Sequence, residues 1–176
     1  MRVLGIDPGY GILGWSVVEK NLKLIDFGAI ETPQGLHISD RLCMVYSRLN
    51  AVISEYNPDT AAIEKLFFNR NTTTALDVSK CLGVVILSIK QAGMDYIEYT
   101  PSQIKLALTG YGRANKTQMQ NAMKMLFKIA EIPKPDDAAD ALAVAACHCF
   151  SFTLNDYQIS PLNTHPRNCT TAPSKL

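Results

Sequence analysis

The pattern of hydrophobic and polar positions predicts five short strands. Val3, Leu4 and Ile6 form a nearly continuous apolar run, which is typical of a strand buried on both faces, and this strand, 2–7, stops at a carboxylate. The segments 12–18 and 22–30 follow as two more strands joined by a turn, so the first three strands form an antiparallel meander. Two further strands are predicted at 60–64 and 96–99.

Apolar residues that recur at steps of three and four predict the helices. Pro and Gly residues between these segments mark their ends, and side chains that accept hydrogen bonds mark their beginnings. The predicted helices are 39–56, capped by Ser39; 74–92, opened by a capping box of Thr74 and Asp77; a short helix after Thr100; a helix capped near Asn115; and 136–150, capped by Asp136.

The order of these elements predicts an α/β fold. A strand, a helix and a strand in succession imply a right-handed crossover, so 60–64 should lie parallel to 2–7 and beside it. The sheet is then a mixed five-stranded one, an antiparallel meander plus two parallel strands, flanked by helices. Because Asp7 and Glu64 end neighbouring parallel strands, we expect them to face each other where such sheets bind ligands.

Length and composition are those of one globular domain. The chain has 176 residues, of which 47% are hydrophobic and 19% charged, and this is enough to bury a sizeable core. We expect the domain to cover 1–152 and a mobile tail, rich in Asn, Thr, Ser and Pro, to cover 153–176. No signal segment or membrane span is evident, so we expect a cytoplasmic protein with no membrane partner.

Charge and cysteine content narrow the candidate chemistry. The net charge is +1, so a site for a polyanion must come from local clustering of Lys and Arg. The five cysteines are odd in number and lack the spacing of a disulfide framework, which favours reduced core thiols. Cys147, His148 and Cys149 are consecutive helical residues that point in different directions, which argues against a zinc site.

Three separate segments place acids in apolar surroundings. Asp7 and Glu64 end strands, and Asp137 and Asp140 share one face of the last helix. Each acid alone has a structural explanation, as a turn residue or as a residue near a helix N-terminus. Four neighbouring carboxylates repel one another, however, and two Mg²⁺ ions would neutralise them. Such a pair of ions hydrolyses phosphate esters, so the acids predict a nuclease.

Four short motifs in a fixed order make the resemblance to a known family specific. They are 5–9 (GIDPG), 62–64 (AIE) followed by Phe67, 110–112 (GYG) before Lys116 and Gln118, and 137–143 (DAADALA). In these motifs the chain resembles the RuvC family of bacterial Holliday junction resolvases, within the RNase H-like superfamily.

The resemblance implies an RNase H-like fold and a set of site residues. Asp7, Glu64, Asp137 and Asp140 would be the catalytic residues and hold two Mg²⁺ ions, for which Mn²⁺ can substitute. Phe67 would contact unstacked bases, and Lys105 and Lys116 would serve DNA binding and catalysis. Together with Lys65, Arg70 and Arg113, these lysines are candidates for a local basic rim that binds DNA.

The expected activity is metal-dependent, paired cleavage of four-way DNA junctions in recombination and repair. Paired cuts need two sites, and the second half of the helix 74–92 is apolar nearly all round, which predicts a homodimer built on Val84, Val85, Ile86, Leu87 and Ile89. The resemblance also implies the RuvA–RuvB branch migration complex as a partner.

Other functions remain open at this point. The chain could be another RNase H-like nuclease that acts on structured RNA, of the YqgF type, or a junction-binding protein that does not cut. An actin-like ATPase is disfavoured because that fold needs a second copy of the phosphate loop.

Overall fold

The computed structural model describes residues 1–66 and 72–157, with the backbone alone for 72–74 and 152–157. Its centre is a five-stranded sheet in the order β3-β2-β1-β4-β5. The first three strands pair antiparallel, β4 lies parallel to β1, and β5 lies parallel to β4, which confirms the predicted fold class. The strands are β1 (Arg2–Asp7), β2 (Ile12–Glu19), β3 (Leu24–Glu31), β4 (Thr60–Glu64) and β5 (Asp95–Tyr99).

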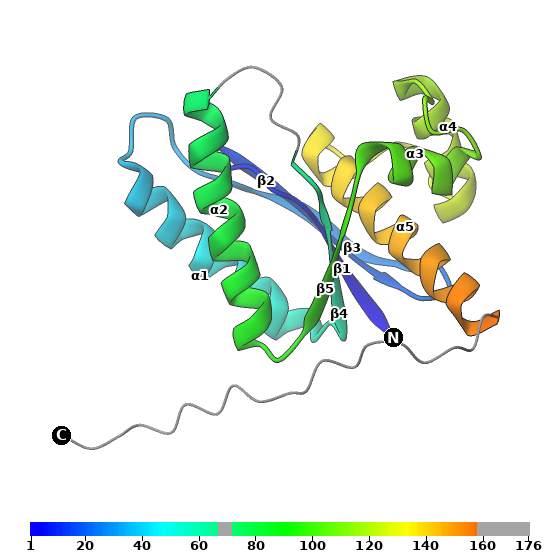
Figure 1. Cartoon of the computed structure of the whole chain (residues 1–176), viewed down its shortest axis with the longest axis horizontal. Helices are drawn as coiled ribbons and strands as arrows, with labels where there is room; N and C mark the ends of the chain where they lie inside the picture. Colours follow the sequence, from blue (N-terminus) through cyan, green and yellow to red (C-terminus); the bar gives the residue numbers. More distant parts are fainter. Residues whose placement is uncertain (67–71, 158–176) are drawn as a thin grey trace.

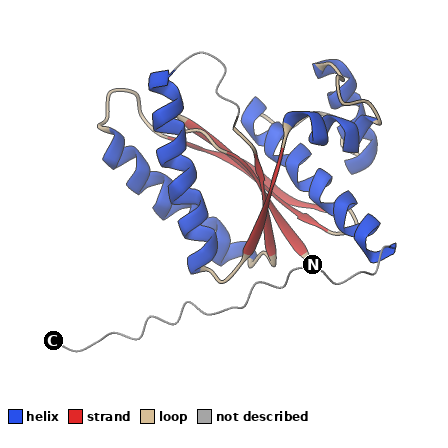
Figure 2. Ribbon diagram, viewed as in Figure 1, coloured by secondary structure: helices blue, strands red, loops and turns tan. Residues whose placement is uncertain are grey.

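Helices cover both faces of the sheet (Figures 1 and 2). One face carries α1 and α2, which pack against each other, and the other carries α5, which lies on β1 and β2. The shorter α3 and α4 form a pair on the α5 side, with α3 in contact with α5. The helices are α1 (Ile38–Tyr56), α2 (Thr72–Gln91), α3 (Pro101–Thr109), α4 (Lys116–Phe127) and α5 (Asp136–Tyr157).

The alternation of side chains along β1 divides the core into two parts. Leu4 and Ile6 belong to the cluster under α1 and α2, whereas Val3 belongs to the cluster under α5. Since successive side chains of a strand point to opposite faces, Asp7 shares the α5 face with Val3. The same alternation in β4 places Glu64 on the α5 face, because Ala62 belongs to the α5 cluster. Both acidic side chains therefore lie on the face of the sheet that α5 covers.

The predicted dimer surface on α2 is wrong in part. Val85 and Ile89 are fully buried and belong to the cluster under α1 and α2, so the protein's own core uses them. Val84 and Ile86 are partly buried against the same cluster, and Leu87 is 51% exposed. A helix packed on both the sheet and α1 needs a wide apolar arc, which accounts for most of the pattern.

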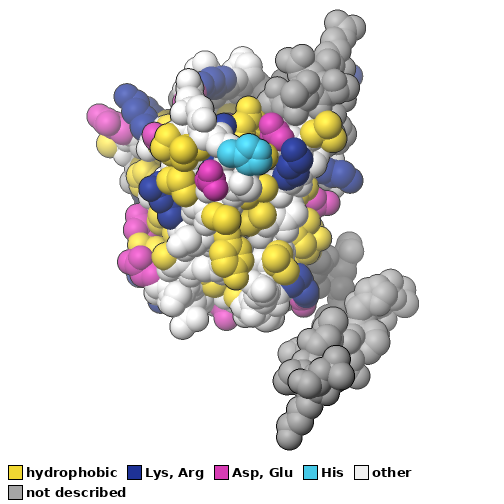
Figure 3. Space-filling view, turned by 90° about the vertical axis from the view of Figure 1, so that its left-hand side faces the viewer, with side chains coloured by type: hydrophobic (Ala, Val, Ile, Leu, Met, Phe, Trp, Pro, Cys, Tyr) yellow, Lys and Arg dark blue, Asp and Glu magenta, His cyan; other side chains and the backbone are white. Residues whose placement is uncertain are grey.

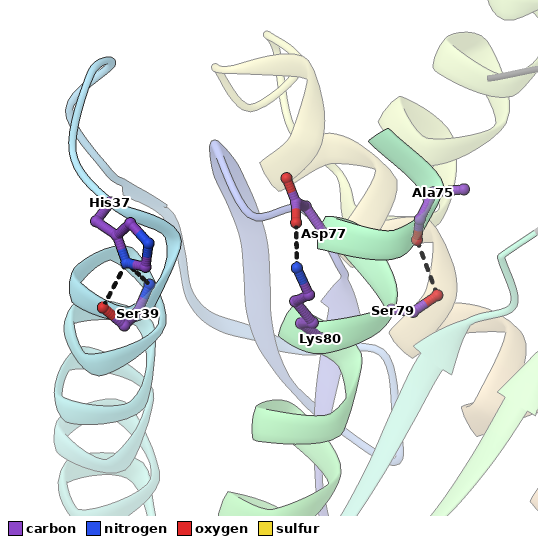
Figure 4. Close-up of polar contacts among 6 residues, drawn as sticks. All are labelled: His37, Ser39, Ala75, Asp77, Ser79 and Lys80. Atoms are coloured by element: carbon purple, nitrogen blue, oxygen red, sulfur yellow. Dashed lines mark hydrogen bonds and ion pairs between the residues drawn. The ribbon is translucent and has the colours of Figure 1, made fainter. Parts of the chain in front are cut away.

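Three of the predicted helix caps differ in the structure, and Figure 4 shows residues near two of them, at α1 and α2. His37, not Ser39, caps α1: its Nδ1 accepts from the backbone N–H of Ser39 and lies 2.8 Å from the Ser39 hydroxyl. The second helix begins at Thr72, so Asp77 lies inside it and its carboxylate accepts from Lys80 at 2.8 Å. The caps predicted for α3 and α4 are confirmed, and both form full capping boxes.

The last helix begins as predicted but extends further. It continues to Tyr157, seven residues past the predicted end at 150, and thus takes in the first residues of the predicted tail 153–176. Its first residue is Asp136, which was predicted to be the N-cap and which instead pairs with Lys116. Residues 158–176 lie outside the described part of the chain.

The cysteines that the structure describes are free, and their settings differ. Cys81, Cys147 and Cys149 are buried as predicted, but Cys43 is exposed on α1. Cys147 and Cys149 approach the carbonyls of residues on α3 and β2, and His148 between them contacts Tyr99 Oη at 2.9 Å. Within 1–66 and 72–157, no helix combines the length and apolar character needed to cross a membrane.

Candidate active site

The carboxyl ends of β1 and β4 bring two acids together. Ile6 pairs with Ile63 in the parallel ladder, so the next residues, Asp7 and Glu64, end adjacent strands at the same edge of the sheet. This confirms the predicted strand pairing. Both side chains point toward α5, as the alternation of the two strands requires.

Two glycines allow α5 to approach this edge closely. Gly14 pairs with Asp7 in the β1–β2 ladder, and a Cβ at Gly14 would lie 1.9 Å from the Asp137 carbonyl oxygen. A Cβ at Gly5 would lie 2.2 Å from the carbonyl oxygen of Ala141, which also accepts from Ser16 Oγ at 3.0 Å. Any side chain at either position would push the helix away. This contact places the first turns of α5, with Asp137 and Asp140, beside Asp7.

The pKa values report how strongly these acids interact. Burial and the charges of Glu64, Asp140 and Asp137 raise the pKa of Asp7 to about 8. Burial and the charge of Asp140 raise the pKa of Glu64 to about 7, against the opposing effect of Lys105. The pKa of Asp140 is raised too, by desolvation and by the nearby aspartates. The four acids therefore share one electrostatic site.

The carboxylates do not converge on a single point. Among the described residues, no three Asp, Glu, His or Cys side chains lie close enough together to hold one metal ion. The chemistry of the donor set, four carboxylates with two of them raised toward neutral pKa values, fits a hard divalent cation with oxygen ligands.

A cleft of about 250 Å³ opens beside the acids, between α5 and the pair formed by α3 and α4. Glu64 and Asp140 line one part of it, and Lys105 and Lys116 line another. The structure thus brings the two predicted lysines to the acid site. Lys116 Nζ is held 2.7 Å from Asp136 Oδ2, and Asp136 is the third acid that lines the cleft, whereas Asp7 and Asp137 are not among the described lining residues.

The other predicted DNA-binding residues do not line the cleft or lie outside the described residues. Arg113 is exposed in the connection between α3 and α4 and is not among the described residues that line the cleft. Phe67 and Arg70 lie in 67–71, outside the described residues.

Sequence reasoning missed Met119 and Gln120, which also line the cleft. Met119 belongs to the apolar stripe of α4, and that pattern does not tell a cleft wall from a core face.

The sequence comparisons point to one family. The family model described as crossover junction endodeoxyribonuclease RuvC matches residues 3–148. The crossover junction endodeoxyribonuclease RuvC of Caldicellulosiruptor saccharolyticus is 51% identical over 162 residues, which cover 90% of this chain and 98% of the relative. That of Halothermothrix orenii is 48% identical over 158 residues, which cover 88% and 96%.

Solved structures agree with this assignment. The structure of T. thermophilus RuvC in complex with a Holliday junction substrate matches with a TM-score of 0.84 and 31% identity, over 88% of this chain and 96% of that one. The yeast mitochondrial Holliday junction resolvase Ydc2 matches with a TM-score of 0.64 at 13% identity, a likeness of fold alone. The chain belongs to the RuvC family of crossover junction endodeoxyribonucleases.

Proposed function

We propose that this protein resolves four-way DNA junctions in recombination and repair, by paired hydrolysis of phosphodiester bonds. The observation that carries the proposal is the gathering of four carboxylates from three segments beside a cleft that two lysines line. Family membership supports the reaction, and the similar T. thermophilus RuvC in complex with a Holliday junction substrate supports the choice of DNA.

The proposed cofactor is a pair of Mg²⁺ ions, for which Mn²⁺ substitutes. Asp7, Glu64, Asp137 and Asp140 would hold them, and the ions would supply Lewis-acid chemistry at the phosphodiester. Support comes from the carboxylates themselves: burial and the neighbouring acids raise the pKa of Asp7 to about 8 and that of Glu64 to about 7, so their ionised forms are disfavoured in the protein alone. A divalent cation would offset their negative charge and favour the ionised forms.

The lysines of the cleft are proposed to contact DNA. Lys105 and Lys116 would face phosphate oxygens, because an ammonium group at the mouth of an acidic site can pull a polyanion toward it. Arg113 is exposed on the same α3–α4 side and would extend the contact. Phe67 and Arg70 follow Glu64 closely in the sequence, and we propose that Phe67 stacks on unpaired bases at the crossover.

A homodimer would provide the two sites that paired cuts require. The revised candidate surface is the outer face of α2, where Leu76 is 64% and Leu87 is 51% exposed, together with Tyr46 of α1, which is 39% exposed. Hydrophobic side chains gather on this side of the molecule (Figure 3). An isologous contact through this face would relate two active sites by a two-fold axis, which matches the two like strands of a junction.

The setting of the reaction follows from family resemblance. We propose that the protein acts in the cytoplasm, with no membrane partner, and that the RuvA–RuvB branch migration complex delivers the junction to it.

The test is a cleavage assay that compares three substrates: a mobile four-way DNA junction, a linear duplex of the same sequence, and structured RNA. We expect paired nicks in the junction with Mg²⁺ or Mn²⁺, none in chelator, and none with Glu64→Gln. Preferential cleavage of the RNA would favour a nuclease of the YqgF type. Tight junction binding without cleavage at saturating Mg²⁺ would favour a protein that only binds.

A further inference from the structure

The connection between β1 and β2 directly follows Asp7 and is tightly folded. A Cβ at Gly9 would lie 2.0 Å from the Ile12 carbonyl oxygen, so the chain turns back on itself within residues 8–11. This turn fixes the direction in which the chain leaves Asp7. Any movement of the turn would therefore be transmitted to the Asp7 backbone.

Thr32, the residue after β3, ties this turn to the sheet. Its side chain is buried, and its hydroxyl donates to the Tyr10 carbonyl at 2.6 Å, with the Gly11 carbonyl at 3.3 Å. Its backbone N–H donates to the Gly11 carbonyl at 2.9 Å. Two successive carbonyls of the turn are thus bound by one residue.

Arg41, in the first turn of α1, contacts both Thr32 and the turn. Its Nε donates to Thr32 Oγ1 at 2.7 Å, and its Nη2 donates to the Thr32 carbonyl at 3.2 Å. The guanidinium carbon also lies 4.6 Å from the centre of the Tyr10 ring, the geometry of a cation–π contact. One planar side chain therefore binds both the turn and the residue that anchors it, which a lysine could not do.

Helix α2 supports the turn as well, since Cys81 Sγ donates to the Gly9 carbonyl at 3.4 Å. Arg41 forms no ion pair with any carboxylate in the described part of the chain. The charges that raise the pKa of Asp7 are those of Glu64, Asp140 and Asp137, and the charge of Arg41 is not among them. Any influence of Arg41 on the acid site must therefore pass through the backbone of the turn.

We propose that Arg41 is a positioning residue for Asp7: through Thr32 and Tyr10 it fixes the turn 8–11 and thereby holds the Asp7 carboxylate where a divalent cation is bound. The inference rests on the proposed function of Asp7. It adds a residue of α1, on the opposite face of the sheet from α5, to the groups that set the geometry of catalysis.

The test compares Arg41→Ala and Arg41→Lys with Arg48→Ala. Arg48 lies on the same helix and donates to the Glu31 carbonyl at 3.0 Å, so it is matched in residue type, helix and kind of contact but does not touch the turn. A displacement of about 1 Å at a reacting group can cost on the order of 100-fold in rate. We therefore expect both Arg41 variants to cut a junction about 10- to 100-fold more slowly than Arg48→Ala, with unchanged affinity for the junction.

A second readout does not depend on cleavage. The rise in melting temperature on adding MnCl₂ to the DNA-free protein reports cation binding, and both Arg41 variants should need more Mn²⁺ than Arg48→Ala for the same rise. If Arg41→Ala does not fold, Thr32→Val removes only the bridging hydroxyl and should shift the Mn²⁺ titration in the same direction.

Three results would overturn the proposal. The first is that Arg41→Ala matches Arg48→Ala in both the Mn²⁺ titration and the cleavage rate. The second is that Arg41→Lys fully restores the Mn²⁺ titration and the cleavage rate. The third is a loss of junction affinity large enough to account for the slower cutting. Failure of the proposed function looks different, because the wild-type protein and Arg48→Ala would then leave the junction uncut while the Mn²⁺ titration still compares the variants.

Discussion

Asp7 lies in surroundings that oppose its ionisation. Its pKa is raised to about 8 by burial and by Glu64, Asp140 and Asp137, whereas an aspartate in an unfolded chain has a pKa of about 4. Between these two values the folded protein holds a proton that the unfolded chain has released. In chelator, the free energy of unfolding should therefore fall as pH rises through this window.

Asp7→Asn is expected to separate stability from catalysis. The amide keeps the shape and has no charge to bury, so in chelator at pH 8 the variant should melt at a higher temperature than the wild type, and at pH 4 the two should differ little. Cleavage of a junction should fall about 100-fold or more, since a proposed cation ligand is lost. Melting curves at the two pH values and a single-turnover assay measure both effects. Near-normal cutting by this variant would remove Asp7 from the metal site.

The pair of Lys116 and Asp136 suggests a second change at the residue scale. Both side chains are about two-thirds exposed, so a DNA phosphate competes with the Asp136 carboxylate for the ammonium on even terms. Asp136→Asn should tighten junction binding by up to about fivefold at low salt and less at high salt. Asp77→Asn is the control, because it frees Lys80, whose side chain is about half exposed, from an ion pair of similar length on α2. Equal gains in the two variants would mean that net charge alone is responsible.

The sequence revealed the acids but not the residue proposed to position one of them. Asp7 and Glu64 were identifiable because a carboxylate at the end of an apolar run needs compensation. Arg41 occupies a polar position in an amphipathic helix, where arginine is ordinary, and its role depends on a threonine nine residues away. Contacts of this kind become visible only when the fold brings the segments together.

At the scale of elements, the contact between α5 and β2 decides whether the acids meet. A methyl group at Gly14 would lie 1.9 Å from the Asp137 carbonyl oxygen, so either β2 or the first turn of α5 would have to move. We expect Gly14→Ala to lower stability by about 1–3 kcal/mol and to lower cleavage further than the stability loss explains. Thermal unfolding and cleavage well below the melting temperature check this. Normal values for both would show that the helix can shift at no cost.

Helix α2 offers a paired test of the dimer. Leu87→Glu changes an exposed side chain, so it should leave the fold intact, yield monomers and allow at most single nicks in a junction. Val85→Glu places a charge in the core and should cost several kcal/mol of stability. Sedimentation and thermal unfolding separate the two effects. A Leu87→Glu protein that stays dimeric and makes paired cuts would exclude this face as the interface.

The caps show how far local sequence determines the elements. Thr100 and Asn115 were predicted correctly as caps, and in the structure each has a Gln three residues later that completes a reciprocal box. Ser39 and Thr74 also fit a local pattern, but α1 begins earlier, at a histidine cap, and α2 begins two residues before Thr74. Where several polar residues precede a helix, tertiary packing decides which of them becomes the cap.

At the scale of the whole molecule, α5 is the last element that the structure describes. Removal of the chain after Tyr157 would leave every described strand and helix in place, whereas a cut after Phe150 would remove part of α5. We expect the protein truncated after Tyr157 to keep the melting temperature and junction cleavage of the full chain. A marked loss of either would assign the residues beyond 157 a role in stability or in the reaction.

The position of α5 in the chain also bears on how the protein is made. Asp7 belongs to β1, the first of the described strands, but Asp137 and Asp140 are synthesised only after all five described strands, and α5 must then pack on β1 and β2. Synthesis proceeds from the N-terminus, so the nascent chain carries Asp7 and Glu64 without their partners for most of translation. The proposed active site can therefore be assembled only after α5 has been synthesised and has packed on the sheet.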